Sequence, residues 1–291
     1  MCAGRRPRTG MITATIIMTT ITPIITATRV IAMPTIRASG SSRTCMGPIA
    51  VMITTTTTRT DMITNSACSN DLALLLWLSP AFPVGAFAYS HGLEWAVEAG
   101  DIVDAGSLRL WLEDLSDHGA PRADATLFAA AHRAVSRQDW IGLNDANELA
   151  IALAGSMERR LETGAQGLAF LLAARAAWDC EALAHLPAAG GDPVAYAIAV
   201  GAASAGHGFR LEAALPAFVV AVFANLVSAA VRLSAIGQTD GQRVLAALLP
   251  RLAAMAVECA GADLEALGGC TFRSDLAALR HETQYSRLFR S

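Results

Sequence analysis

Residues 211–236 read Leu-Glu-Ala-Ala-Leu-Pro-Ala-Phe-Val-Val-Ala-Val-Phe-Ala-Asn-Leu-Val-Ser-Ala-Ala-Val-Arg-Leu-Ser-Ala-Ile, and they form the longest helix that the sequence predicts. The 19 residues 213–231 carry no charge, which approaches the roughly 20 apolar residues of a membrane span. However, Pro216, Asn225 and Ser228 interrupt the stretch, and an amide side chain facing lipid is costly. We therefore expect a buried central helix, and no membrane span.

The segments on both sides of this helix also carry apolar residues at helical spacing, with capping residues at their ends. We expect further helices over 72–78, 92–99, from 107 onward, 121–136, 140–155, 156–178, 193–206 and 241–259. Asp192-Pro193 is typical of a cap followed by a first helical residue, and residues 179–192 read as a surface connection. Because no segment alternates as a strand would, the sequence predicts an all-α bundle of about eight to ten helices in a single domain.

The composition excludes several classes of enzyme. All 22 basic residues are arginine, so the 291-residue chain contains no lysine. P-loop NTPases, protein kinases and Schiff-base enzymes all depend on a lysine amine. The net charge of −3 and the 6% aromatic content also give no reason to expect a surface that binds nucleic acid.

Residues 1–61 differ from the remainder of the chain. They carry seven arginines against one acid, Asp61, and are dominated by Thr, Ile, Met and Ala without helical or strand periodicity. A targeting peptide, a disordered tail and a wrong-frame reading of an upstream gene all fit this composition. We favour the wrong-frame reading. If a stretch of His and Asp codons is read one base late, it yields Met, Thr and Ile codons, which are the residues that dominate here. Residues 1–61 would then be a disordered or non-native leader, Met62 the true start and 62–291 the folded domain.

Motifs for metal binding or catalysis are weak. The six cysteines contain no CxxC pair, and the six histidines lack HExxH or another ligand spacing. Ser90 lies in a segment that departs from GxSxG, because Ala88 replaces the first glycine. We expect Ser90 to cap a helix and not to act as a nucleophile. Glu94 and Glu98 share a helix face, which would either meet a basic partner or be solvated.

The C-terminal residues 273–291 form a basic, partly apolar tail on an acidic body. Four arginines stand against Asp275 and Glu282, with Tyr285, Leu288 and Phe289 between them. Arginine and aromatic residues of this kind are typical of interface hot spots. The sequence leaves open whether this is a tail that docks a partner or a frayed or self-packed terminus.

Four stretches together resemble the UreF family of urease accessory proteins. They are Leu-Ser-Pro-Ala-Phe-Pro-Val-Gly-Ala-Phe-Ala-Tyr-Ser-His-Gly-Leu-Glu (78–94), Ala-Asn-Leu-Val-Ser-Ala-Ala-Val-Arg-Leu (224–233), Gly-Gln-Thr-Asp-Gly-Gln (237–242) and Arg-His-Glu-Thr-Gln-Tyr-Ser-Arg-Leu-Phe-Arg-Ser (280–291). The resemblance covers about residues 70–291. It also supports the interpretation of the leader, since a His-rich tail suits a nickel-binding urease protein encoded upstream.

The resemblance implies a cytoplasmic, non-catalytic, dimeric scaffold for nickel insertion into apo-urease. Its partners would be a UreD/UreH-type accessory protein, the UreG GTPase and apo-urease. The protein itself would hold no stable cofactor: nickel would be handled transiently by the complex, while GTP and Mg²⁺ would belong to the GTPase. A helical enzyme with an unrecognised site and a small membrane protein are the alternatives, which partner co-purification and solubility without detergent would separate.

The resemblance also assigns two sets of residues. The partner-binding set comprises Arg280, His281, Glu282, Gln284, Tyr285, Arg287, Leu288, Phe289 and Arg290. A GTPase-facing or dimer surface would comprise Phe87, Tyr89, Ser90, His91, Glu94, Arg159, Arg160, Glu162 and Gln166. Residues 240–242 are interpreted either as a structural turn between two helices or as a functional motif.

Overall fold

A computed structural model of the chain describes residues 72–187 and 191–291. The leader 1–61 and the predicted start at Met62 lie outside these residues. Within the described residues all regular secondary structure is helical and no strand occurs, which confirms the all-α fold class.

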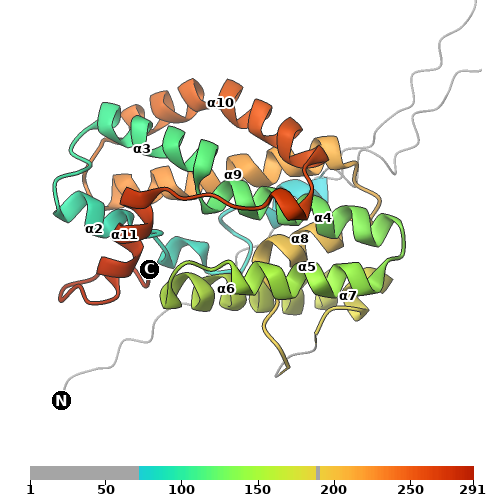
Figure 1. The fold of residues 1–291 in the computed structure, drawn as a ribbon. Helices are drawn as coiled ribbons and strands as arrows, with labels where there is room; N and C mark the ends of the chain where they lie inside the picture. The colour runs from blue at the N-terminus through green and yellow to red at the C-terminus, as the bar shows by residue number, and fades with distance from the viewer. Residues whose placement is uncertain (1–71, 188–190) are drawn as a thin grey trace, which may run out of the picture. The chain divides into compact units, whose positions relative to one another are not determined.

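The helices follow one another with short connections (Figure 1). After a helical segment at 72–77, they are η1 (Ala86–Ala88), α2 (Leu93–Glu98), α3 (Ala105–His118), α4 (Ala120–Ser136), α5 (Trp140–Ala152), α6 (Met157–Ala177), α7 (Glu181–Ala184), α8 (Tyr196–Gly206), α9 (Leu211–Arg232), α10 (Gln238–Gly261), η2 (Leu264–Ala266) and α11 (Phe272–His281).

The predicted central helix is α9, and it lies among α10, α4, α8 and α2. Its inner face contributes the fully buried Leu215, Phe223 and Leu226 to the core. By length and composition both α9 and α10 could cross a membrane, although the sequence had suggested only α9. Half of the most apolar window of α9 and a third of that of α10 are buried inside the protein. Core helices pass the same test, so these two helices are weak evidence for a membrane span.

Several helices begin where the sequence places a capping residue. Asp104 accepts a hydrogen bond from Ser107 N at 2.8 Å, and the Ser107 hydroxyl accepts one from Asp104 N, so the two form a capping box. Ser156 accepts a hydrogen bond from the backbone of Arg159 at the start of α6. These local hydrogen bonds satisfy backbone donors that the first helical turn leaves free.

The predicted start of α8 at Pro193 is wrong. The helix begins at Tyr196, because Asn147 on α5 holds the preceding residues extended. Its side-chain amide donates to Pro193 O at 3.0 Å and accepts from Ala195 N at 2.9 Å. A contact from a distant helix therefore overrides the local capping signal at Asp192.

The interpretation of residues 240–242 as a turn between helices is also wrong. These residues lie in the first turns of α10, which begins at Gln238. A Cβ atom at Gly241 would lie 3.0 Å from Val227 Cγ1 of α9. The glycine therefore permits close packing of the two longest helices.

Two α-helices, besides the 3-10 helices η1 and η2, lie where none was predicted. The short α7 falls within the expected surface connection 179–192. The second, α11, begins one residue before the expected tail 273–291, forms its first part and packs against α2. The expected tail is thus helical in its first half, and turns and bends follow in its second half.

Candidate functional site

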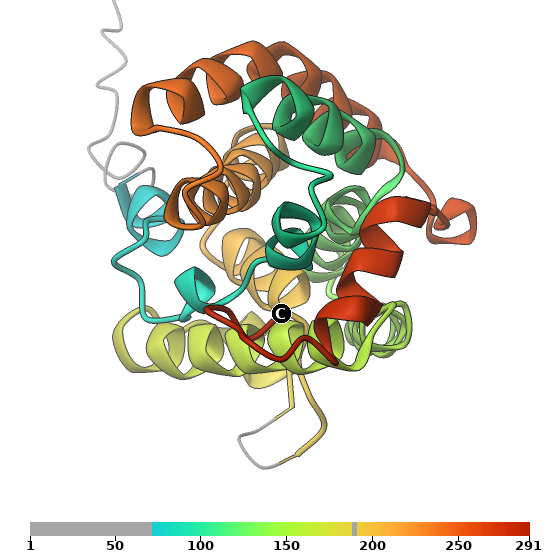
Figure 2. The same ribbon diagram turned by 90° about the vertical axis from the view of Figure 1, so that its left-hand side faces the viewer.

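Residues 282–291, which we call the C-terminal segment, lie against α2, η1 and α6. Figure 2 shows this segment in dark red along the yellow-green α6. Glu282 accepts a hydrogen bond from Met157 N at 2.8 Å, and Arg287 pairs with Glu158 at 2.6 Å. Farther along, Arg290 N donates to the Ala88 carbonyl at 2.8 Å. The segment is therefore attached along its length, and the self-packed interpretation of the terminus describes it better than a frayed end.

His281, the last residue of α11, is completely buried between two carboxylates. Its Nδ1 lies 2.6 Å from Glu158 Oε2, and its Nε2 lies 3.1 Å from Glu94 Oε2. Glu94 also accepts the backbone N–H groups of Leu288 at 2.6 Å and Phe289 at 2.9 Å. Glu94 is only 7% exposed and its partners lie within the chain, so neither predicted environment describes it, whereas Glu98 on the same face is exposed.

Glu162 is the centre of a second group of polar side chains on α6. Its carboxylate lies 2.7 Å from Arg159 Nη1 and 2.7 Å from His91 Nε2. It also accepts hydrogen bonds from Gln166 at 2.9 Å and from the Ser291 hydroxyl at 2.8 Å. Burial raises the pKa of Glu162, but Arg159 and His91 outweigh it, and the pKa is lowered from 4.5 to about 2.

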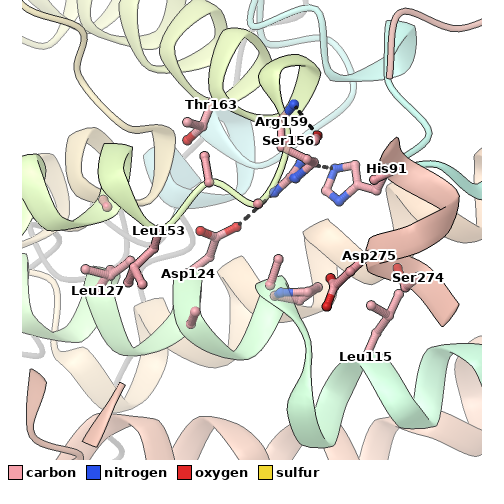
Figure 3. Close-up of a pocket in the computed structure, with 17 residues that line it drawn as sticks. His91, Leu115, Asp124, Leu127, Leu153, Ser156, Arg159, Thr163, Ser274 and Asp275 are labelled. Carbon is pink, nitrogen blue, oxygen red and sulfur yellow. Dashed lines mark hydrogen bonds and ion pairs between the residues drawn. The ribbon is translucent and has the colours of Figure 1, made fainter. Parts of the chain in front are cut away.

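Arg159 connects this group to α4. Its guanidinium lies 3.5 Å from Asp124 and 2.9 Å from His91 Nε2, at one wall of a cavity of about 80 Å³ (Figure 3). Burial raises the pKa of Asp124, and the nearby Arg159 offsets this only in part. His91 has a left-handed backbone with φ of 58° and also lines a second, mainly apolar cavity of about 200 Å³ beside η1 and α9.

Ser90 joins the C-terminal segment to the start of α2. Ser90 N donates to the Ser291 carbonyl at 2.7 Å, and the Ser90 hydroxyl donates to the same oxygen. That hydroxyl also accepts a hydrogen bond from Glu94 N in the first turn of α2 at 3.3 Å. The N-cap of α2 is nevertheless Gly92, which has no side-chain cap, so the prediction that Ser90 caps this helix is wrong and Ser90 instead binds the end of the C-terminal segment.

Phe87 and Phe289 meet through an arginine that the sequence did not single out. Arg232, at the end of α9, donates to the Phe87 carbonyl and lies 4.4 Å from the centre of the Phe289 ring. Phe289 is buried, whereas Phe87 is exposed. The arginine thus fixes η1 and the C-terminal segment to the same helix.

The structure connects several members of the two predicted sets in one network, whereas Arg160, Arg280 and Tyr285 have no side-chain contact with it among the described residues. Buried members are Tyr89, Ser90, Glu94, Glu162, Gln166, His281 and Phe289. Exposed members are Phe87, Arg160, Arg280, Tyr285, Arg287, Leu288 and Arg290. His91, Arg159, Glu282 and Gln284 are partly exposed. The buried members can contact a partner directly only if the segment moves, whereas the exposed members are available to one.

Sequence reasoning missed Asp124, Glu158, Arg232 and Ser291. Each is positioned by residues more than 30 positions away in the chain. No local spacing signals such a pairing. Within residues 72–187 and 191–291, no three or more His, Cys, Asp or Glu side chains gather in an arrangement that could hold a metal ion.

A family profile and individual relatives point to the same protein family. A sequence profile described as UreF matches residues 102–249. The urease accessory protein UreF of Methylobacterium radiotolerans is 55% identical over 220 residues, which are 76% of this chain and 96% of the relative. The proteins of the same name from Rhodopseudomonas palustris strain TIE-1 and Xanthobacter autotrophicus are each 55% identical, over 218 and 220 residues. These alignments cover 75% and 76% of this chain and 91% and 90% of the two relatives.

Proposed function

The chain belongs to the UreF family of urease accessory proteins, and from this membership we propose that it is a non-catalytic scaffold that presents its C-terminal segment to another accessory protein during urease maturation. The observation that carries the proposal is the attachment of this segment. Buried Glu94 and Glu162 hold its backbone and its last side chain. The side chains of Tyr285, Leu288 and Arg290 are exposed.

This arrangement suits protein binding better than chemistry on a small molecule. The charged groups beneath the segment already form ion pairs and hydrogen bonds with one another and with the segment itself. The exposed side chains, in contrast, include an aromatic residue, a leucine and arginines on a segment whose backbone is hydrogen-bonded to the fold. A backbone that is already ordered lowers the entropy cost of association.

The finer parts of the proposal follow from the family. The partner of the C-terminal segment would be a UreD/UreH-type protein, and the complex would recruit the UreG GTPase and deliver nickel to apo-urease in the cytoplasm. GTP and Mg²⁺ would be bound by the GTPase, and its activity would be modulated within the complex.

We also propose that the protein forms a homodimer through the outer face of α6. Met157, Leu161, Leu168 and Leu172 lie along one stripe of this helix and are exposed. Burial of such a stripe against a second copy would remove apolar surface from water. Arg160 lies beside the stripe and is exposed, whereas Glu162 and Gln166 face the interior.

The proposal is tested by co-expressing the chain with the urease subunits and the other urease accessory proteins of the same organism. We expect the tagged chain to capture the UreD-type protein and the GTPase, and urease activity to depend on its presence. A Tyr285→Ala/Leu288→Ala variant should fold normally but capture less of the UreD-type protein. Full urease activation without the chain would contradict the proposed function.

A further inference from the structure

The buried His281 lies at the centre of a chain of charged groups that holds the C-terminal segment. Its Nδ1 lies 2.6 Å from Glu158 Oε2 and its Nε2 lies 3.1 Å from Glu94 Oε2. Both carboxylates also bind the segment, because Glu94 accepts two of its backbone N–H groups and Glu158 pairs with Arg287 at 2.6 Å. The histidine at the end of α11 is therefore connected to two anchors of the segment.

The geometry fits an imidazole ring that carries hydrogen on both nitrogens. An ionised carboxylate can only accept hydrogen bonds, whereas a neutral imidazole has one N–H group and one lone pair. With a neutral His281, one lone pair would face a carboxylate oxygen at a position that is 0% exposed. Only the doubly protonated ring can donate to Glu94 and Glu158 at the same time.

The charges around the ring balance only when this proton is bound. Two positive groups, protonated His281 and Arg287, then meet two negative ones, Glu94 and Glu158. Without the proton, two negative groups remain against one positive group. The side chains of Glu94 and Glu158 are only 9% and 12% exposed. A charge that is buried to this degree destabilises the fold when it has no partner.

The neighbouring charged residues offer the ring no other partner. Seven further acidic, histidine and arginine residues lie within four positions of Glu94, Glu158 or His281 in the chain, and none forms an ion pair or side-chain hydrogen bond with the ring. Some pair with one another or bind the backbone of α6, and the others are exposed or contact the segment. They are His91, Glu98, Arg159, Arg160, Glu162, Arg280 and Glu282.

We propose that His281 is a pH-sensitive latch, which holds residues 282–291 on the fold while its ring is doubly protonated and releases them as the pH rises. Histidine changes its charge near neutral pH, so a buried histidine can switch a contact. Loss of either ring hydrogen would turn a lone pair toward Glu94 or Glu158, and both of these hold the segment. The stabilisation is therefore present while the proton is bound and is lost as the pH rises.

The latch is a property of the chain alone and acts before any partner binds. It would set the fraction of molecules that present an ordered C-terminal segment, which the proposed function requires. Its test needs no partner protein, so failure of the latch is distinguishable from failure of the proposed function.

The test is amide hydrogen exchange of the full chain at about pH 6 and about pH 9, measured on the segment by mass spectrometry. A free peptide with the sequence of residues 282–291 corrects for the effect of pH on the chemical exchange rate. We expect the protection of the segment relative to this peptide to fall about 100-fold between the two pH values, because a buried charge loses its partner. The core helices α4 and α8 should keep their protection.

Two variants assign the effect to the ring. His281→Gln cannot take up the proton, so its segment should be weakly protected at both pH values. Glu158→Gln offers an amide that can donate to a neutral ring, and it also removes one negative charge. Its segment should therefore be better protected at pH 9 than that of the wild type. The control His118→Gln replaces an exposed histidine at the end of α3 and should behave as the wild type does.

Equal protection of the wild-type segment at the two pH values would overturn the latch. A loss of protection that persists unchanged in His281→Gln, or that extends to α4 and α8, would overturn it too. If circular dichroism shows that His281→Gln does not fold, the wild type and Glu158→Gln decide. A Glu158→Gln segment that is no better protected at pH 9 than the wild-type segment then counts against the latch.

Discussion

Glu162 keeps its negative charge although it is only 1% exposed. An unpaired carboxylate at such a position would be neutral, because burial disfavours the charged form. Arg159 and His91 compensate for the burial, and the Ser291 hydroxyl donates a further hydrogen bond. Removal of one member would therefore leave buried partners unsatisfied.

We predict that Glu162→Gln lowers the free energy of unfolding at pH 7 by about 3 kcal/mol, because a buried ion pair loses one partner. The unfolded chain binds a proton at Glu162 below about pH 4.5, whereas the folded chain does so only near pH 2. The charged carboxylate thus stabilises the fold above pH 4.5, and this contribution is lost as the pH falls toward 2. Urea denaturation should show a difference between wild type and variant that is about 2 kcal/mol smaller at pH 3 than at pH 6.

Glu258→Gln is the matched control. Glu258 pairs with Arg122 at 2.7 Å, but its side chain is 59% exposed. Its removal should cost less than about 1 kcal/mol. A difference between wild type and Glu162→Gln that stays constant from pH 6 to pH 3 would contradict the assignment of a strongly lowered pKa.

At the scale of the elements, helices that bury an apolar face and carry their own cap were predictable from sequence. The capping residue Ser156 and the apolar run of α9 identify their helices without knowledge of the fold. In contrast, α11 was missed because its apolar side chains point outward and the side chains on its inner face are mostly small. Its position depends on a backbone contact at Gly92, for which no sequence pattern exists.

This contact leads to a prediction for Gly92→Ala. Gly92 has φ of 76°, and the added Cβ would collide with the backbone of α11. We expect a loss of about 2 kcal/mol or more in the free energy of unfolding, from strain and overpacking together. Gly100→Ala is the control, since Gly100 has φ of 79° but open space around its Cβ position. It should cost only about 1 kcal/mol, and equal losses in thermal or urea unfolding would show that α11 does not press on α2.

At the scale of the whole chain, the candidate site joins residues that are far apart in sequence. Glu94 and His281 are separated by 187 positions, and Glu162 and Ser291 by 129. The sequence motifs drew attention to both regions, but nothing in them indicated that the regions touch. Spacing within a motif reports on one helix, whereas this network depends on how α2, α6 and α11 come together.

Truncation after His281 tests how far the C-terminal segment supports the fold. It removes none of the residues of the described helices, so the far-UV circular dichroism should stay the same. However, it removes the buried Phe289 and leaves Glu94 and Glu162 without several of their donors. We expect the free energy of unfolding to fall by at least about 3 kcal/mol, as for deletion of a buried phenylalanine.

Truncation after Arg290 removes only Ser291 and should cost about 1–2 kcal/mol. An unchanged urea midpoint for the longer deletion would mean that the segment is not docked in solution, and that its exposed side chains are not held in place for a partner.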